Sequence, residues 1–497
     1  MGLDADYKHR CNTLGINITC NRQSNDNHNH HINCNPIIKF SFQSMDLYPC
    51  LFCPSSLVPV CLGSWFLDLL LSRLHAICIQ VFIHLHFPEP MTKFQTHVLS
   101  NGIRLIHYPV ESPVAHCGLM INTGSRDELP DQHGIAHLLE HMLFKGTQKR
   151  SSYHILSRME DVGGEINAYT TKEEICIHST FFTQYHARAM EMISDIAFNS
   201  SFPDKEVQKE KEIIYDEINS YKDSPSELIF DEFEELIFDG NSLGRNILGE
   251  ESRLRTFTRE TILDFIRQNY STRQMVVSSV GKIPFDTLVK SFTKYFGHYP
   301  FKSNEQRGPA AYSYQATKRV TQRGTFQAHC ILGNIAYDIA SAKRLTLHLL
   351  NNYLGGPGLN SRLNLALRER RGYTYTIDSL YTTYSDTGNI TIYFGTDKMS
   401  VDKCIHFIHK ELSAIREKKM SDATLRKAKK QLLGQIAISS ENNENLMLSM
   451  AKSMLVFNKV DSLEEIGRKI EAITADEIRN VANEIFEEAK LSYLIYN

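Results

Sequence analysis

The first patterned stretch of the chain changes from a strand period to a helix period. Apolar positions alternate in THVLSNGIRLIHYPV (residues 96–110), which predicts two strands joined by a turn at Asn101 and Gly102. AHCGLMINTG (115–124) predicts a further strand. In GIAHLLEHMLF (134–144) the apolar residues instead recur at helical spacing. The chain is therefore expected to mix strands with helices.

The same two periods continue along the chain. Helical patterns cover residues 185–198, 203–221, 225–238 and 258–269, and strand patterns cover INAYTTKEEICIHSTFF (166–182) and MVVSSVG (275–281). Both element types occur in quantity, so the pattern predicts the α+β fold class.

A second part of the chain repeats the first in the same order. HLLEHML (137–143) aligns with HLLNNYL (348–354), and KEVQKEKEIIYDEI (205–218) aligns without gaps with ATLRKAKKQLLGQI (423–436). Near each end, a helix that begins at threonine precedes a strand: TRETILDFIRQNY precedes MVVSSVG, and TADEIRNVANEIF precedes LSYLIY. Three aligned pairs in one order predict two homologous halves.

The boundary between the halves is indicated by residues 301–318, which follow neither period and contain Gly, Pro, Ser and Asn. We interpret this segment as a linker between a first half at 91–300 and a second half at 319–497. In the second half, Thr474 and Glu477 form a predicted capping box for the last helix.

Residues 1–90 differ in composition from the rest, because a polar Asn, His and Cys stretch precedes an apolar run at 57–87. One interpretation is an upstream extension outside the working protein, with Met91 as the natural start. The others are a metal-binding leader and a membrane anchor through 57–87. Asp68 and Arg73 count against the anchor, since each would cost about 2.5–3.5 kcal/mol at the centre of a bilayer. We favour the extension, and membrane association is not expected.

Composition narrows the classes of partner. The chain of 497 residues is 42% hydrophobic and 22% charged, which excludes a disordered or fibrous protein. Its 54 basic and 57 acidic side chains give a net charge of −3, and so no positive field for nucleic acid. Only four cysteines follow residue 90, and they are far apart in sequence, which favours a reduced compartment and a cytoplasmic location.

Candidate chemistry lies in the pentapeptide HLLEH. His137 and His141 are four residues apart, so a helix places both imidazoles on one face, with Glu140 beside them. Neutral imidazoles suit Zn²⁺, and a nearby carboxylate can accept a proton from an activated water. The pattern would arise by chance roughly 0.1 times in a chain of this composition, so a merely solvated helix face remains the alternative interpretation.

A catalytic zinc needs a third protein ligand, and the helix at 203–221 offers Glu210 and Glu217. They are seven residues apart and share one helix face, although a solvated charged helix would also explain them. The repeat helps to decide between a functional and a merely solvated helix face, because the second half keeps the apolar pattern but lacks the charged residues. At the positions of Glu140, His141, Glu210 and Glu217, the second half has Asn351, Asn352, Ala428 and Gln435. We therefore treat the four charged residues as one functional set and expect no zinc in the second half.

These segments resemble those of the inverted-motif zinc peptidases, the family of pitrilysin, insulin-degrading enzyme and the mitochondrial processing peptidase. The resemblance lies in HLLEHMLFKGT, EINAYTTKE (165–173), EKEIIYDEI (210–218), LGGPGLNSRL and LRERRGYTYTI (367–377), and it covers nearly everything after Met91. The layout is most similar to the short, processing-peptidase-like subfamily. The resemblance implies two homologous α/β halves that face each other across a chamber, each with a mixed, mostly antiparallel sheet and helices on one face.

The resemblance also implies roles for the motif residues. His137, His141 and Glu217 would be the zinc ligands, and Glu140 would be the general base. The interval from His141 to Glu217 (217 − 141 = 76) fits the family spacing. Glu210 matches an additional glutamate that would orient a ligand or tune its basicity.

Four further residues match substrate-binding and catalytic positions of the family. Asn167 and Ala168 match an edge strand to which substrates add a β-strand. Tyr375 would donate a hydrogen bond to the developing oxyanion, and Arg368 would hold a substrate carbonyl. From the residues alone, the Arg368 and Tyr375 pair would be a surface helix end and an ordinary strand tyrosine. Lys211, where arginine is common, and Pro357, within the glycine run, depart from the family pattern.

The sequence therefore predicts a zinc-dependent endopeptidase that cleaves unfolded peptides or presequence-like segments with a metal-activated water. The alternative is a non-catalytic scaffold or partner subunit of a processing-peptidase-like complex. The resemblance further implies pairing, either as a homodimer or with a related inactive subunit. Non-catalytic members of the family lose their site residues, whereas this chain retains the complete set.

Overall fold

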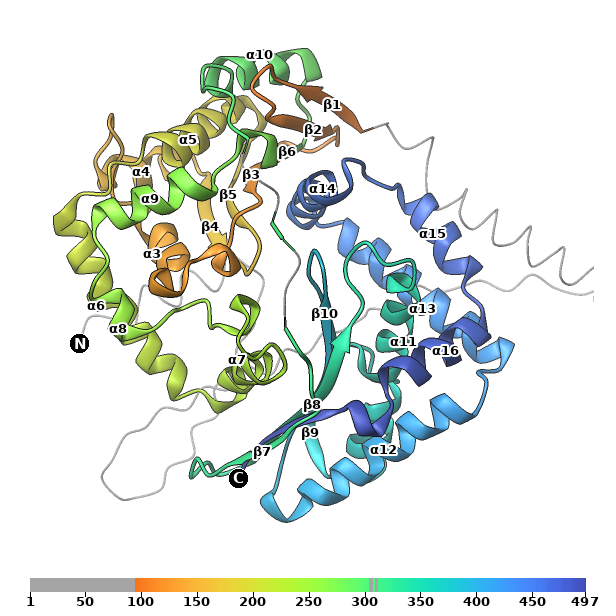
Figure 1. The fold of residues 1–497 in the computed structure, drawn as a ribbon. Coiled ribbons are helices and arrows are strands. Elements are labelled where there is room, and N and C mark those ends of the chain that lie inside the picture. Colours follow the sequence, from red (N-terminus) through yellow and green to blue (C-terminus); the bar gives the residue numbers. More distant parts are fainter. Residues whose placement is uncertain (1–93, 304–306, 309–311) are drawn as a thin grey trace, which may run out of the picture. The chain divides into compact units, whose positions relative to one another are not determined.

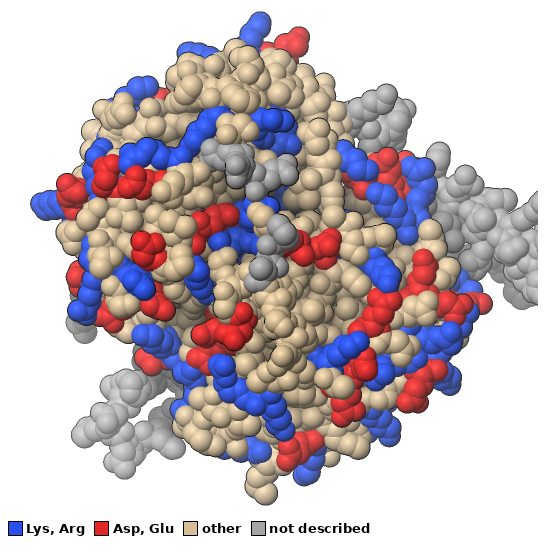
Figure 2. All heavy atoms as spheres, viewed as in Figure 1, with Lys and Arg blue, Asp and Glu red and all other residues tan. Residues whose placement is uncertain are grey.

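The computed structural model describes residues 94–303, 307–308 and 312–497, and these belong to one compact unit of the chain (Figure 1). The interpretations of residues 1–90, including a membrane anchor at 57–87, lie outside the described residues. Of the helices in the described ranges, none has the length and apolar character needed to cross a bilayer. Acidic and basic side chains alternate over the face shown in Figure 2, as the small net charge of −3 suggests.

The first half is built on a six-stranded sheet with the order β1-β2-β6-β3-β5-β4. Its strands are β1 (Gln95–Val98), β2 (Arg104–Tyr108), β3 (Val114–Ile121), β4 (Glu165–Thr170), β5 (Ile175–Phe182) and β6 (Met275–Val280). All neighbours are antiparallel except β2 and β6. The predicted hairpin turn is confirmed: β1 and β2 are joined through Gly102, whose φ of 89° favours glycine.

Helices pack on one face of this sheet and enclose the first core. They are α3 (Ile135–Met142), α4 (Ser152–Glu160), α5 (His186–Asn199), α6 (Asp204–Lys222), α8 (Glu251–Leu254), α9 (Arg259–Asn269) and α10 (Phe285–Phe296). The core contains the buried apolar faces of these helices and the inward positions of the strands. For example, α5 contacts β3 and β5, and α10 contacts β2.

The second half has a five-stranded sheet with the order β7-β11-β8-β10-β9. Its elements are β7 (Lys318–Thr321), β8 (Ala328–Ala336), α11 (Arg344–Gly355), a π-helix (Asn364–Glu369), β9 (Thr374–Thr383), β10 (Gly388–Thr396), α12 (Val401–Glu417), α13 (Asp422–Ser440), α15 (Leu463–Ala472), α16 (Ala475–Ile485) and β11 (Ser492–Tyr496). A second apolar core lies between the sheet and these helices. The fold class is confirmed as mixed, with two mostly antiparallel sheets.

The two sheets repeat each other strand by strand. The order β2-β6-β3-β5-β4 corresponds to β7-β11-β8-β10-β9, and in each sheet only the first of these pairs is parallel. A side-chain contact is repeated as well. Lys211 on α6 donates to the carbonyl of Arg255 at 3.1 Å, and Lys429, the aligned residue on α13, donates to the carbonyl of Glu471 at 2.6 Å. Both lysines are buried, and each donates to a carbonyl group at the C-terminal end of a neighbouring helix that would otherwise lack a partner.

One helix from each half packs on the sheet of the other half. α7 (Pro225–Ile237), from the first half, contacts β8 and β11, whereas α14 (Asn443–Phe457), from the second half, contacts β2, β3 and β6 (Figure 1). Apolar clusters form at both contacts. Met447, Met450 and Met454 of α14 are buried against Ile106, Met120, Cys176, Val276 and Val280 of the first sheet. The halves therefore share their cores reciprocally.

Candidate metal centre and active site

The helix that carries the HLLEH motif is fixed at its first turn by a buried carboxylate. The Glu128 carboxylate accepts hydrogen bonds from the backbone N–H groups of Gly134 (3.0 Å) and Ala136 (2.9 Å), which would otherwise lack partners at the start of α3. Gly134 has a φ of 99°, and a Cβ there would lie 2.9 Å from the Cα of Gly249. A glycine is therefore required where the chain enters α3.

Three candidate metal donors come together from α3 and α6. The imidazole rings of His137 and His141 are 4.7 Å apart between centroids. The Nε2 atoms of His137 and His141 lie 3.6 Å and 3.5 Å from Oε2 of Glu217. Ligand atoms at ordinary zinc distances on two corners of a tetrahedron are about 3.3 Å apart, so the spacing fits a zinc ion with only a small contraction. In the part of the chain that the structure describes, this is the one group of three such residues with donor atoms within 4.8 Å of one another.

The protonation of His137 also suits a metal ligand. Burial, reinforced by the neighbouring His141, lowers the pKa of His137 to about 3. The ring is therefore neutral at physiological pH and keeps a lone pair for a cation. Two imidazoles and one carboxylate leave room for a fourth, non-protein ligand, which is the pattern of a catalytic rather than a structural zinc site.

Glu210 lies behind one of these donors. Its Oε2 is 3.3 Å from Nδ1 of His141, and the Glu210 side chain is only 2% exposed. Because an ionised carboxylate can only accept hydrogen bonds, Nδ1 of His141 is the donor in this contact, and Nε2 is the ring nitrogen that faces Glu217. The structure thus brings Glu210 to the side chain of a candidate metal ligand, where the family resemblance implies an orienting group.

Glu140 is half-buried on the same helix. Burial raises the pKa of its carboxyl group, while hydrogen bonds from Thr170 and the nearby His141 oppose that rise. A carboxylate with a raised pKa holds a proton more readily near neutral pH, which suits a group that accepts and returns protons. Thr170 belongs to β4, so Glu140 adjoins the edge of the first sheet.

Comparison with known proteins places the chain in a family. The family model for insulinase (peptidase family M16) matches residues 105–251, and the model for the peptidase M16 inactive domain matches residues 256–432. The uncharacterized zinc protease YmxG of Bacillus subtilis is 31% identical over 394 residues, which cover 79% of this chain and 95% of that protein. The chain belongs to the insulinase family, peptidase family M16. The resemblance inferred from the motifs is therefore confirmed.

Other relatives and solved structures agree. An uncharacterized zinc protease of Rickettsia felis is 31% identical over 404 residues, covering 81% of this chain and 97% of that protein. The fold is similar to a protease from Helicobacter pylori, with a TM-score of 0.75 at 18% identity over 82% of this chain and all of the other. A peptidase M16 inactive domain from Pseudomonas fluorescens has a TM-score of 0.76 at 17% identity, covering 82% of this chain and 98% of that one. These findings support a protease of the zinc-dependent class.

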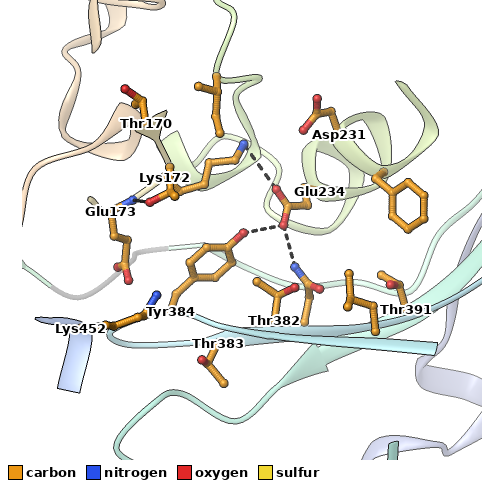
Figure 3. Close-up of a pocket in the computed structure, with 15 residues that line it drawn as sticks. Thr170, Lys172, Glu173, Asp231, Glu234, Thr382, Thr383, Tyr384, Thr391 and Lys452 are labelled. Atoms are coloured by element: carbon orange, nitrogen blue, oxygen red, sulfur yellow. Dashed lines mark hydrogen bonds and ion pairs between the residues drawn. The ribbon is translucent and has the colours of Figure 1, made fainter. Parts of the chain in front are cut away.

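Both halves line an open cavity of ≈ 400 Å³, and its lining includes Thr170, the residue that hydrogen-bonds to Glu140. The segment Thr170–Glu173 and α7 line one side, and β9 and β10 line the other (Figure 3). Glu234 of α7 points into it and accepts hydrogen bonds from Tyr384 (2.5 Å) and Asn389 (2.8 Å), with Nζ of Lys172 at 3.4 Å. Sequence reasoning missed this polar centre, because its members come from four separate segments with no shared motif.

Asn167 and Ala168 lie on β4, the edge strand of the first sheet. They pair with His178 and Ile177 of β5 on one side, and no described strand pairs with β4 on the other. Asn167 is exposed and Ala168 is half-buried. The backbone of β4 is therefore available for an added strand next to Glu140.

Arg368 and Tyr375 lie apart from the donor cluster in the contacts that the structure describes. Arg368 is near the end of the π-helix and its Nε is 3.7 Å from the carboxylate of Glu369. Tyr375 is at the start of β9 and is 83% exposed. No described hydrogen bond or ion pair joins either residue to His137, His141 or Glu217. Their assignment stays a prediction from the family resemblance.

Proposed function

We propose that the protein is a zinc-dependent endopeptidase in which His137, His141 and Glu217 hold the metal. The observation that carries the proposal is the convergence of two imidazoles and one carboxylate, with Glu140 on the same helix. When bound, zinc acts as a Lewis acid that polarises a carbonyl and lowers the pKa of a water molecule. The names of the related zinc proteases support the choice of metal.

The proton transfers of hydrolysis fall to Glu140 in this proposal. Its carboxylate accepts the proton of the attacking water and then delivers it to the leaving amine. The raised pKa that burial gives this group makes both transfers accessible near neutral pH. Glu210 holds the ring of His141 in the orientation that directs Nε2 towards Glu217.

We propose that the substrates are extended, unfolded peptides or presequence-like segments. Unpaired backbone groups on β4, around Asn167 and Ala168, support binding by strand addition, which reads the peptide backbone and tolerates many sequences. Arg368 and Tyr375 would then act on substrate carbonyls from the second half, Arg368 by holding one and Tyr375 by donating to the oxyanion. Tyr375 is 83% exposed, which leaves its side chain accessible to a substrate.

We further propose a cytoplasmic enzyme that pairs as a homodimer or with a related inactive subunit. The four described cysteines are buried as free thiols, and burial raises their pKa, so they fit a reducing compartment. A purely non-catalytic subunit is the weaker alternative, since the donor set and Glu140 are all present.

The test combines metal analysis with cleavage of an internally quenched peptide. Glu140→Gln should bind as much zinc as the parent protein and lose at least about 100-fold in kcat/KM, because only the proton acceptor is removed. Glu212→Gln, on the exposed side of α6, is the matched control and should behave as the parent. A parent protein that binds no zinc, or a Glu140→Gln variant with full activity, would show the proposal to be wrong.

A further inference from the structure

Lys145 connects to the donor cluster through a single carboxylate. It lies three residues beyond the end of α3, and its Nζ is 2.7 Å from Oε1 of Glu210. The other oxygen of Glu210 is the one that lies 3.3 Å from Nδ1 of His141. Lys145, Glu210 and His141 thus form a chain of contacts that ends on a candidate metal ligand.

Lys145 matters to these contacts because the Glu210 carboxylate is buried. The Glu210 side chain is 2% exposed, so its charge is removed from water and needs a compensating partner inside the protein. The described groups that meet this carboxylate are the Lys145 ammonium and the His141 ring. Lys145 is itself only 23% exposed, and Glu210 is the ion-pair partner that the structure gives it.

The internal repeat separates this role from a general structural one. His137 and His348 are 211 positions apart (348 − 137 = 211), so Lys145 aligns with Gly356. In the second half all three contacting residues are therefore replaced. Gly356 stands at the position of Lys145, Ala428 at that of Glu210 and Asn352 at that of His141.

A lysine with a structural role behaves differently in the same comparison. Lys211 and its counterpart Lys429 are both retained, and each donates to the carbonyl of a neighbouring helix. The second half thus keeps the lysine that serves the fold. It forms the five corresponding strands and the aligned helices α11 and α13 without a lysine at the position of Lys145.

We propose that Lys145 is a positioning residue for the metal centre. Its ammonium group holds the Glu210 carboxylate in place, and Glu210 in turn holds the Nδ1–H group of His141, so that Nε2 faces Glu217. Without the lysine, the carboxylate turns towards water or another donor and the His141 ring loses its fixed orientation. This inference rests on the proposed zinc site but adds a residue to it.

The test measures metal binding in a Glu140→Gln background, where no hydrolysis interferes. Lys145→Met removes the charge and keeps most of the side-chain length, Lys145→Arg keeps the charge, and Lys149→Met is the matched control on an exposed lysine nearby. We expect Lys145→Met to weaken zinc affinity by about 10–100-fold in chelator competition, because loss of a group behind a ligand has effects of this size. Lys145→Arg should recover most of the affinity, and Lys149→Met should match the parent.

Two further readouts separate positioning from general damage. The visible absorption spectrum of the Co²⁺-substituted protein should shift in Lys145→Met, since the ligand field depends on the orientation of His141. In a Glu210→Gln background, Lys145→Met should cause no additional loss, because the contact it removes is already broken. If Lys145→Met does not fold, Lys145→Gln is measured in the same way.

The inference is overturned if Lys145→Met binds zinc within about twofold of the parent with an unchanged Co²⁺ spectrum, or if its effect adds fully to that of Glu210→Gln. Failure of the proposed function looks different. In that case the parent protein itself binds no zinc, whereas failure of this inference leaves a parent that binds zinc and cleaves peptides.

Discussion

Truncation of Met450 to alanine tests whether α14 of the second half completes the core of the first. Met450 is fully buried and belongs to the cluster with Ile106, Met120 and Val276. The substitution removes three heavy atoms beyond Cβ and leaves a cavity between α14 and the sheet. Methionine-to-alanine changes in cores cost about 2–5 kcal/mol, so we expect a loss of about 3 kcal/mol in the free energy of unfolding.

Urea unfolding followed by circular dichroism gives the size of the effect, and amide hydrogen exchange gives its location. Although the residue belongs to the second half, exchange should become faster in β3 and β6, which α14 covers. Met399→Ala is the control, because that side chain is 91% exposed and should cost almost nothing. Our reasoning is refuted if stability falls by less than about 0.5 kcal/mol, or if faster exchange is confined to the second half.

Three other predictions address the metal site, the pH dependence and the contact between the halves. Glu217→Gln should remove bound zinc and peptide cleavage together, as measured by elemental analysis and the quenched-peptide assay, whereas Asp216→Asn, its exposed neighbour, should retain both. Burial lowers the pKa of His107 from 6.5 to about 4. Below pH 6.5 the unfolded chain therefore takes up a proton that the folded protein does not, and the stability present above pH 6.5 is lost as pH falls towards 4. His107→Leu should therefore reduce the loss of unfolding free energy between pH 7 and pH 4 by up to about 3 kcal/mol, and an equally steep loss in the variant would contradict the assignment. Glu173 accepts hydrogen bonds from Arg126 (2.5 Å) and from the backbone of Ser385 (3.0 Å). Glu173→Ala should therefore lower the free energy of unfolding by about 3 kcal/mol and speed hydrogen exchange at the tip of the β9–β10 hairpin. Unchanged protection at that tip would show that the contact is unimportant.

Much of the first half could be predicted from local periodicity. The segment predicted as a helix at 203–221 is α6 (Asp204–Lys222), and the one at 185–198 is α5 (His186–Asn199). Each has a continuous amphipathic pattern, because one side faces the core and the other faces water. The capping box at Thr474 and Glu477 is also confirmed, since it depends only on contacts within one turn.

Periodicity could not predict how α7 and α14 are exchanged. Both show apolar positions at helical spacing, but the spacing does not say which sheet those positions cover. Methionine is frequent on α14 and fits irregular gaps against many surfaces, so its side chains carry no signature of a particular partner. The partner is decided by the three-dimensional arrangement of two sheets far apart in sequence.

In the candidate site, too, some residues could be predicted from local sequence patterns and others could not. His137, Glu140 and His141 follow from spacing within one helix. The repeat marks Glu210 and Glu217 equally, because the second half lacks both charges, and only the family resemblance assigns the ligand role to Glu217. The contact of Lys145 with Glu210 had no such signal, because the two residues are distant in sequence and lysine is common at helix ends. The cavity around Glu234 also had no signal in the sequence, since segments from residue 170 to residue 452 line it.

The reciprocal placement of α7 and α14 has a consequence for synthesis on the ribosome. The strand β6 ends at Val280, but the helix that covers its sheet begins only at Asn443, 163 residues later (443 − 280 = 163). At about 5–20 residues per second, the nascent chain carries an apolar sheet surface open to water for roughly 10–30 s. Any protein that shields nascent chains has its main opportunity in that interval, and ribosome-bound chains stalled before residue 443 should be the species it captures.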